Sequence, residues 1–228
     1  MQLFDQLLQF PLFQGMSRDD LSQVAERTKF DFLKLQPGNT IVAEDDTATH
    51  LHFLLAGTVI TDTTSDDRSY SVTEYADAPL ILQPEVLFGY NQRYTRTSKA
   101  YTQVSLLRLD KKEVTRLSQE FMVFRINLLN IFATQSQRAA RQPWRRTPTT
   151  LRDRIVMFFN QHCVHPVGQK IFHILMNTLA AELNDSRLNV SRQLNALERN
   201  GLIVLKRGMV VIPHLEALNG VRPVHQGV

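Results

Sequence analysis

The stretch DSRLNVSRQLNALERNGLI, residues 185–203, predicts a short amphipathic helix near the end of the sequence. Val190, Leu194 and Leu197 recur at helical spacing and form its apolar side. Asp185 or Ser186 can cap the helix through a side-chain oxygen. The opposite side carries Arg187, Leu188, Ser191, Arg192 and Asn195. This side is short and basic, which suits the DNA major groove, where arginine can donate to both acceptors of guanine.

The segments on either side of this helix complete a winged helix-turn-helix. Upstream, NTLAAELND (residues 177–185) is typical of a short helix, and Asn184 tolerates the left-handed conformation that a tight turn often needs. Downstream, LIVLKRGMVVI (residues 202–212) predicts a β-hairpin, or wing, with Lys206 and Arg207 at its turn. Two helices and a wing of this kind predict a DNA-binding domain.

The predicted DNA contact has a division of roles. Arg187 and Arg192 are expected to read bases, and Lys206 and Arg207 to meet the phosphate backbone. The full predicted set is Arg187, Leu188, Ser191, Arg192, Asn195, Lys206 and Arg207, with Ser191 and Asn195 touching bases or phosphates. The alternative is that the arginines only keep a solvent face soluble. Turn chemistry, basic face and basic wing occurring together favour DNA.

The charge distribution points the same way. The chain of 228 residues has a net charge of +4, but residues 1–90 carry −9 and residues 91–228 carry +13. Such a split suggests one half that avoids polyanions and one half that attracts them. An uneven scatter of charge over two solvated surfaces is the alternative, because clustering alone does not prove a nucleic-acid partner.

The N-terminal part has a different spacing of apolar residues. Apolar spacing over residues 3–32 predicts short helices, and residues 30–109 contain short alternating runs separated by polar turns. The expected strand segments are DFLKL, TIVAE, LHFLLAGTVITDT, SYSVTEY and AYTQVSLLRL. Strands at this spacing predict a β-barrel or sandwich. Together with the helical C-terminal part, they make the expected fold class α+β.

A long helix is predicted over residues 110–142. Its apolar residues alternate in steps of four and three, which defines a heptad seam of Leu117, Phe121, Phe124, Leu128, Ile131 and Gln135. So narrow a stripe fits a coiled-coil contact with the same helix of a second copy. The alternative is that the stripe packs on the β-domain of its own chain.

The prolines in RQPWRRTPTT (residues 141–150) predict a domain boundary after this helix. Residues 1–142 are therefore expected to form a sensor domain that includes the dimerisation helix, and residues 148–228 the winged helix-turn-helix. The longest apolar run is too short to cross a membrane, and the N-terminus has no basic signal region. A cytoplasmic protein with no membrane contact is expected.

Enzymatic and metal chemistry find little support in the sequence. His50 and His52 share one face of a strand, as in metal-binding cupin barrels, but the glutamate that cupins place a few residues later is missing. His162 to His165 offers further donors without a partner elsewhere. The single Cys163 excludes an internal disulfide. No catalytic triad, Walker loop or dinucleotide motif appears, so we expect no enzyme, no metal and no cofactor.

At the family level, SRLNVSRQLNALERNGLI (residues 186–203) resembles the recognition-helix motif of the Crp/Fnr family of bacterial transcription regulators, serine-arginine-x-x-valine-x-arginine followed by leucines and a glycine. PLFQGMSRDDL resembles the family's opening helix, and Gly38 and Gly57 fall where its β-roll turns. The resemblance covers nearly the whole chain. It implies an N-terminal cyclic-nucleotide-binding-like β-roll (a jelly roll), a long dimerisation helix, a C-terminal winged helix-turn-helix, and base contacts for Arg187 and Arg192.

Two departures from the family pattern bear on specificity. Leu188 stands where the catabolite activator type carries a cytosine-reading glutamate, and it can offer only apolar contact such as a thymine methyl. In PEVLFGYNQRYTRTS, Pro84 replaces the glycine of the phosphate-binding cassette and has no amide N–H to offer a phosphate. The candidate effector residues are Glu85, Arg93, Arg96 and Thr97. We therefore do not expect cAMP, and a vestigial loop that binds nothing is the alternative.

The combined prediction is a homodimeric, sequence-specific DNA-binding transcription regulator on a palindromic operator, with half-sites ~34 Å apart. Its expected partners are double-stranded DNA and a second copy of the chain. RNA polymerase and a small-molecule effector of unknown identity are candidate partners. The alternative is a ligand- or metal-binding β-barrel sensor whose C-terminal helical domain binds a protein.

Overall fold

The computed structural model describes residues 3–141, 144 and 148–220. The chain divides into two compact units. Unit 1 consists of Met1–Val59 and Asp77–Arg145, and unit 2 consists of Ile60–Ala76 and Arg146–Val228. The predicted domain boundary between residues 142 and 148 lies outside the described residues, apart from Trp144.

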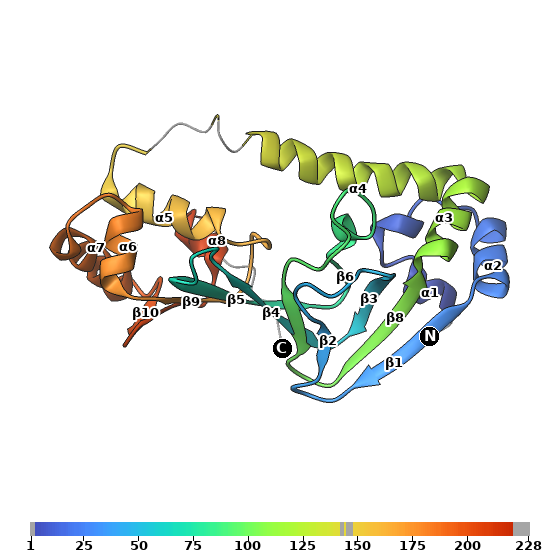
Figure 1. Cartoon of the computed structure of the whole chain (residues 1–228), viewed down its shortest axis with the longest axis horizontal. Helices are drawn as coiled ribbons and strands as arrows, with labels where there is room; N and C mark the ends of the chain where they lie inside the picture. Colours follow the sequence, from blue (N-terminus) through green and yellow to red (C-terminus); the bar gives the residue numbers. More distant parts are fainter. Residues whose placement is uncertain (1–2, 142–143, 145–147, 221–228) are drawn as a thin grey trace. The chain divides into compact units, whose positions relative to one another are not determined.

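Unit 1 combines short N-terminal helices, antiparallel strands and two C-terminal helices (Figure 1). Its elements are α1 (Leu3–Leu7), η1 (Pro11–Phe13), α2 (Arg18–Arg27), β1 (Phe30–Leu35), β2 (Thr40–Val42), β3 (His50–Ala56), β6 (Leu80–Leu82), η2 (Pro84–Val86), β7 (Thr97–Ala100), β8 (Val104–Asp110), α3 (Lys111–Glu120) and α4 (Met122–Arg141). Four strands form an antiparallel sheet in the order β1-β8-β3-β6. The fold class is therefore α+β, as predicted.

The core of unit 1 lies between this sheet and the helices. Phe13 packs on Phe53 of β3 and on Phe124 of α4, with ring centroids 5.8 and 5.5 Å apart. The turns of the sheet need glycine, as the resemblance implied. At Gly57, between β3 and the following strand, φ is +91°, and a Cβ would lie 2.4 Å from the carbonyl oxygen of Gln103. No L side chain fits there without moving the backbone.

The predicted long helix is two helices, α3 and α4, and this corrects the expectation of one continuous helix. Phe121 separates them with φ −119° and ψ 107°, an extended conformation. The Phe121 amide still donates to the Leu117 carbonyl oxygen, and this is the last helical hydrogen bond of α3. The heptad phase that includes Leu117 and Phe121 therefore does not continue unbroken into α4.

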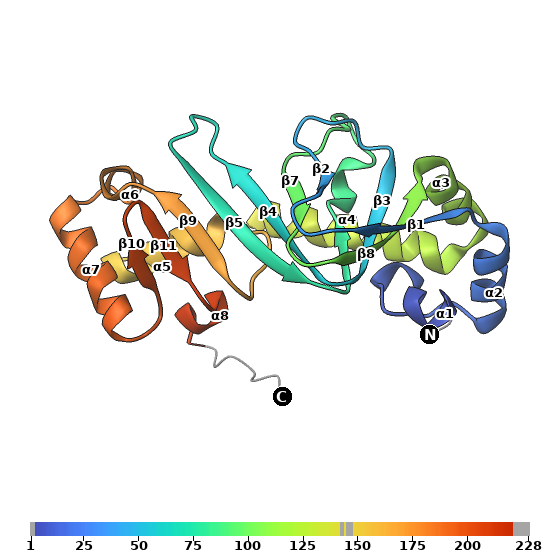
Figure 2. The ribbon, with the colours of Figure 1, turned by 90° about the horizontal axis from the view of Figure 1, so that it is seen from below.

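Two further strands, β4 (Thr58–Thr64) and β5 (Tyr70–Asp77), form a hairpin whose outer part, Ile60–Ala76, belongs to unit 2. The other elements of unit 2 are α5 (Leu151–Gln161), β9 (Lys170–Ile174), α6 (Met176–Glu182), α7 (Arg187–Arg199), β10 (Val204–Lys206), β11 (Met209–Ile212) and α8 (Leu215–Leu218). Strands run side by side in the order β10-β11-β9-β5-β4, and Figure 2 shows β5 along β9. Neither β6 nor β9 was among the predicted strands.

None of the helices in the described ranges combines the length and the apolar character that crossing a bilayer requires.

Candidate nucleic-acid interface and sensor site

Helix α7 begins where the sequence predicts. Ser186 is its N-cap, and the Ser186 hydroxyl oxygen accepts a hydrogen bond from the Asn189 amide at 3.2 Å. Val190, Leu194 and Leu197 are at most 1% exposed and anchor α7 in the core of unit 2, which confirms the predicted apolar side.

The opposite side of α7 faces solvent. Arg187, Arg192 and Asn195 are exposed, and Ser191 is half-buried and accepts a hydrogen bond from the Asn195 side chain at 3.4 Å. Leu188 is 60% exposed, so its apolar side chain is accessible on this face. The five predicted residues thus lie on one face of α7, opposite its buried row.

The turn before α7 is fastened by α5, a feature that the sequence did not reveal. Asn184 adopts φ +47°, the left-handed conformation predicted for it. Arg154 of α5 donates to the Leu183 carbonyl oxygen at 2.8 Å and forms an ion pair with Asp185. Hydrogen bonds from Asn189 and from the Ser186 amide, together with Arg154, hold the pKa of Asp185 below its usual range. A charged carboxylate is favourable at a helix N-terminus.

The wing is present as predicted. Strands β10 and β11 pair antiparallel and turn at Arg207 and Gly208, and Gly208 has φ +70°. Lys206 and Arg207 are exposed at this turn. Two exposed cations therefore lie at the tip of the wing, where a polyanion could reach them.

The structure corrects the predicted dimer seam. Leu117 and Phe124 are fully buried and Leu128 is 7% exposed, all within the core of their own unit. Phe121 and Ile131 are half-buried against the same core. Leu117, Phe124 and Leu128 are therefore not accessible to a second copy, and for these three the alternative, packing within their own unit, is correct. A dimer contact through the half-buried Phe121 and Ile131 stays a prediction.

A second apolar row on α4 is exposed instead. Met122, Ile126 and Leu129 are 61%, 46% and 56% exposed. The row continues at the same alternating steps of four and three through exposed small residues, so that it comprises Met122, Ile126, Leu129, Ala133, Ser136 and Ala140. We call it the α4 seam. The α4 seam is also visible in the sequence as a second heptad row, but its residues are less apolar than those of the row that faces the core.

The candidate effector residues make contacts with one another and with α4. Arg96 forms an ion pair with Glu85 at 2.8 Å. The other carboxylate oxygen of Glu85 accepts a hydrogen bond from Gln135 of α4 at 3.2 Å. Gln135, predicted as a dimer residue, thus lies against the cassette. An anion that bound Arg96 would have to compete with Glu85 for it.

The rest of the cassette is also engaged within the chain. Arg93 donates to the Asp45 carbonyl oxygen, and the Thr97 hydroxyl accepts from the Glu44 amide at 3.0 Å. Gln83, which sequence inspection did not single out, adopts φ +40° before Pro84. Its buried side chain donates to the Arg96 carbonyl oxygen and accepts from the Thr95 amide, at 2.9 and 3.1 Å. Gln83 therefore closes the loop where the family cassette has its glycine turn.

The two histidines of β3 have separate roles. His50 lies 3.9 Å from Asp110, whereas His52 is buried, with its Nδ1 atom 3.4 Å from the Tyr94 hydroxyl. Burial, followed by the charges of His50 and Arg108, lowers the pKa of His52 to about 4. Among the residues that the structure describes, no three or more His, Cys, Asp or Glu side chains gather as a metal site would require.

His52 should make the stability of the protein depend on pH. Well above pH 6.5 the imidazole is neutral in the folded and unfolded chain, so it adds no pH dependence there. As the pH falls from 6.5 to about 4, only the unfolded chain binds the proton, and the free energy of unfolding should fall by about 3 kcal/mol. Urea denaturation at a series of pH values should show this loss in the wild type and a shallower loss in His52→Gln. The exposed His173→Gln serves as the control, and equal slopes for His52→Gln and wild type would contradict the assignment.

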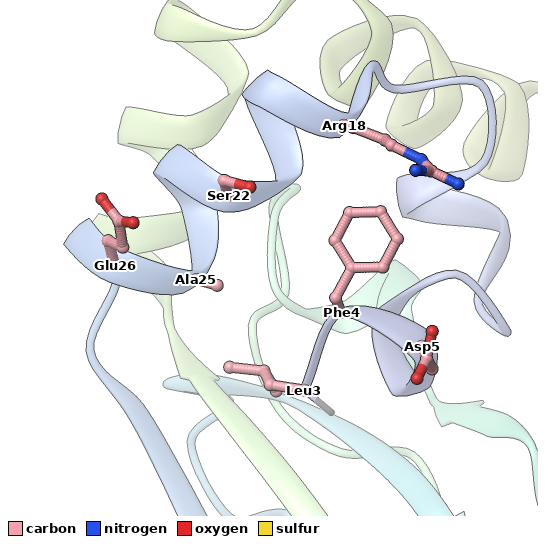
Figure 3. Close-up of a pocket in the computed structure, with 7 residues that line it drawn as sticks. All are labelled: Leu3, Phe4, Asp5, Arg18, Ser22, Ala25 and Glu26. Atoms are coloured by element: carbon pink, nitrogen blue, oxygen red, sulfur yellow. The ribbon is translucent and has the colours of Figure 1, made fainter. Parts of the chain in front are cut away.

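An open pocket of about 530 Å³ lies between α1 and α2 (Figure 3). It is lined by Leu3, Phe4, Asp5, Arg18, Ser22, Ala25 and Glu26. None of the candidate effector residues and no residue of α7 lines it, so we assign it to neither site.

Two family models match the chain. Residues 32–121 match the cyclic nucleotide-binding domain, and residues 153–221 match the Crp-like helix-turn-helix domain. No curated protein sequence matches it.

Solved structures show the same fold over most of the chain. The catabolite activator protein of Thermus thermophilus is 21% identical, with a TM-score of 0.53 over 92% of this chain and 97% of that one. A putative Crp/Fnr-family transcriptional regulator of Eubacterium rectale is 17% identical, with a TM-score of 0.50 and coverage of 92% and 97%. The sensor domain of the regulator DNR of Pseudomonas aeruginosa is 18% identical, with a TM-score of 0.51 and coverage of 64% and 94%. With a cyclic nucleotide-binding-like domain followed by a Crp-like helix-turn-helix, the chain belongs to the Crp/Fnr family of transcription regulators, which are not enzymes.

Proposed function

We propose that a homodimer of this chain binds a palindromic DNA operator, with α7 of each protomer in a major groove. The observation that carries the proposal is the exposed face of α7, where Arg187 and Arg192 stand beside Leu188 on a helix anchored by buried leucines. Arginine supplies bidentate contact to guanine, and an exposed leucine supplies apolar contact to a thymine methyl. Ser191 and Asn195 complete the proposed base-facing set.

A second copy of the chain is the proposed occupant of the α4 seam. The seam has coiled-coil spacing, and its small residues allow two helix backbones to approach closely. An isologous contact between two such helices generates a two-fold axis, and a two-fold axis requires a palindromic site. In this proposal the seam takes the place of the row from Leu117 to Gln135, whose members are buried or half-buried in their own unit.

Selection of bound sequences from a pool of random duplexes tests the proposed function. The purified protein should recover a palindrome at physiological salt, with half-sites ~34 Å apart. Selections with and without cyclic nucleotides also test the sensor. Recovery of no motif under either condition would favour the alternative in which unit 2 binds a protein partner.

Lys206 is expected to contribute affinity without sequence preference. Lys206→Ala should weaken cognate and scrambled duplexes nearly alike, and should lower the slope of log affinity against log salt by about 1 per protomer, because one phosphate contact no longer releases a counterion. Fluorescence anisotropy at several salt concentrations measures both quantities. Lys34→Ala, an exposed lysine on β1, is the matched control and should leave the slope unchanged. A loss confined to the cognate duplex would reassign Lys206 to base contact.

We further propose that the effector of the sensor domain is not cAMP. Pro84 offers no amide hydrogen at the start of η2, and Arg96 is already paired with Glu85. A motif that appeared in the selection only with a cyclic nucleotide would overturn this proposal.

A further inference from the structure

The β4–β5 hairpin supplies a strand to the unit that carries α7. Strand β5 pairs antiparallel with β9 over five residue pairs, from Tyr70 opposite Ile174 to Glu74 opposite Lys170 (Figure 2). On its other side β9 pairs with β11 of the wing. Without the hairpin, β9 would be an edge strand with unpaired backbone groups.

The hairpin also contributes to the hydrophobic core of unit 2. Val72 is 2% exposed and belongs to the same buried cluster as Ile155 and Phe159 of α5. The Tyr70 ring packs on Phe158, also of α5, with centroids 5.7 Å apart. One face of α5 therefore rests on side chains that come from the hairpin.

A buried ion pair fixes the register of this contact. Glu74 Oε1 lies 3.2 Å from Lys170 Nζ, and neither side chain is exposed to solvent. The Glu74 carboxylate accepts hydrogen bonds from the amides of Val164 and His165, and Lys170 Nζ donates to the Val167 carbonyl oxygen at 2.9 Å. A shift of β5 by one residue would turn Glu74 to the opposite face of the sheet and leave Lys170 buried without its ion-pair partner, which is strongly unfavourable.

The contact continues through α5 to the recognition helix. Arg154 of α5 holds the turn before α7 through the Leu183 carbonyl oxygen and the Asp185 carboxylate. Asp185 in turn accepts hydrogen bonds from the Ser186 amide and from Asn189, at 2.8 and 3.0 Å. Support thus passes from the hairpin to α5 and from α5 to the first turn of α7.

We propose that β5 is an integral strand of the DNA-binding unit and that Glu74 is a positioning residue for α7. Glu74 touches no DNA. It holds β5 on β9 through Lys170, and the docked strand supports α5 and, through α5, the orientation of α7. The part of the proposal that concerns DNA rests on the function proposed above. Since the hairpin continues into β3 and β6 of unit 1 along the chain, the sensor unit is connected to the recognition helix by this strand as well as by the segment after α4.

Replacing Glu74 with glutamine in the full-length protein tests the proposal. The substitution leaves the Lys170 ammonium group buried without an opposite charge. Amide hydrogen exchange in β5 and β9 should therefore increase by at least about 10-fold, while exchange in β1 and β8 should not change. Affinity for the cognate duplex should fall by at least about 10-fold, while affinity for a scrambled duplex changes little, because phosphate contacts tolerate a displaced helix better than base contacts do. A purely structural role would lower both affinities together.

Two further variants make the outcome decisive. The double variant Glu74→Leu with Lys170→Met replaces the pair by apolar side chains, which often restores stability, and should recover both the slow exchange and the cognate affinity. If Glu74→Gln fails to fold, the double variant still tests the proposal. Asp66→Asn removes a negative charge at the exposed hairpin turn and should behave as wild type.

Faster exchange with unchanged preference for the cognate duplex would overturn the proposal, as would unchanged exchange in β5 and β9. A wild-type protein that bound no duplex would instead refute the proposed function. In that case the exchange data would still decide whether Glu74 holds β5 on β9.

Discussion

Leu129→Asp is expected to convert the proposed dimer into a monomer and to lower affinity for a palindromic duplex by about 10²–10⁴-fold. Leu129 is 56% exposed in the middle of the α4 seam, so a second copy would have to bury the new carboxylate against an apolar surface. A monomer binds one half-site at a time and loses the effective concentration that links two half-sites, which is the source of the large factor. Sedimentation velocity measures the oligomeric state, and fluorescence anisotropy measures the affinity.

Thr134→Asp is the matched control. Thr134 is exposed on the same helix but outside the seam, so the same new charge should leave both measurements unchanged. Leu128→Asp should give a third result, loss of folded unit 1, because Leu128 lies in the core of its own chain. A Leu129→Asp protein that remained dimeric would show that the second copy binds elsewhere, and a wild-type monomer would leave the seam to another partner.

The sequence predicted α7 and the wing because local chemistry determines them. The cap at Ser186, the left-handed turn at Asn184 and the apolar row Val190, Leu194 and Leu197 lie within a few residues of one another, and each works through a short-range contact. The Arg187 and Arg192 side chains are exposed because the opposite side of the same helix is apolar.

The face of α4 that is accessible to a partner was not predictable in the same way. Helix α4 carries two rows at heptad spacing, and the more apolar row faces the sheet of its own chain. Which row a partner meets depends on where β3 and η1 lie, and on the extended residue Phe121, which separates α3 from α4. A choice based on hydrophobicity alone selects the more apolar row, and in this chain that row packs in the core of its own unit.

Contacts between residues far apart in the sequence were also missed. Glu74 and Lys170 are separated by 96 positions, and the strand that carries Lys170 had no strong alternating pattern. Glu85 and Gln135 are 50 positions apart. Such pairs depend on topology, which neither the periodicity nor the spacing of a single segment specifies.

In each unit a carboxylate with several partners links two elements, although Glu74 is fully buried and the Glu85 side chain is 35% exposed. Glu85 is satisfied by Arg96 and Gln135, and Glu74 by Lys170 and two amides. In each case a carboxylate joins two elements of one unit. An effector that displaced Glu85 from Arg96 would also free a partner of α4, the helix that carries the proposed dimer seam.

Arg192→Ala is expected to lower affinity for the cognate operator by about 1–3 kcal/mol per half-site, which over the two half-sites of a dimer is about 30-fold to 2 × 10⁴-fold. Arg192 is exposed in the middle of the α7 outer face, so the substitution removes a guanidinium without opening a cavity. Affinity for scrambled DNA should fall much less, because non-specific binding depends on phosphate contacts. The preference at one base pair in each half-site should relax in a repeated selection.

Arg199→Ala provides the control that separates base contact from charge. Arg199 is exposed on the last turn of the same helix, whereas residues near the N-terminal end of a recognition helix lie closest to base edges. The two variants lose the same charge, so a general electrostatic effect would lower both affinities alike. A loss for Arg192→Ala that was equal on cognate and scrambled duplexes would assign Arg192 to phosphate, and sequence preference would then have to come from Arg187 and Leu188.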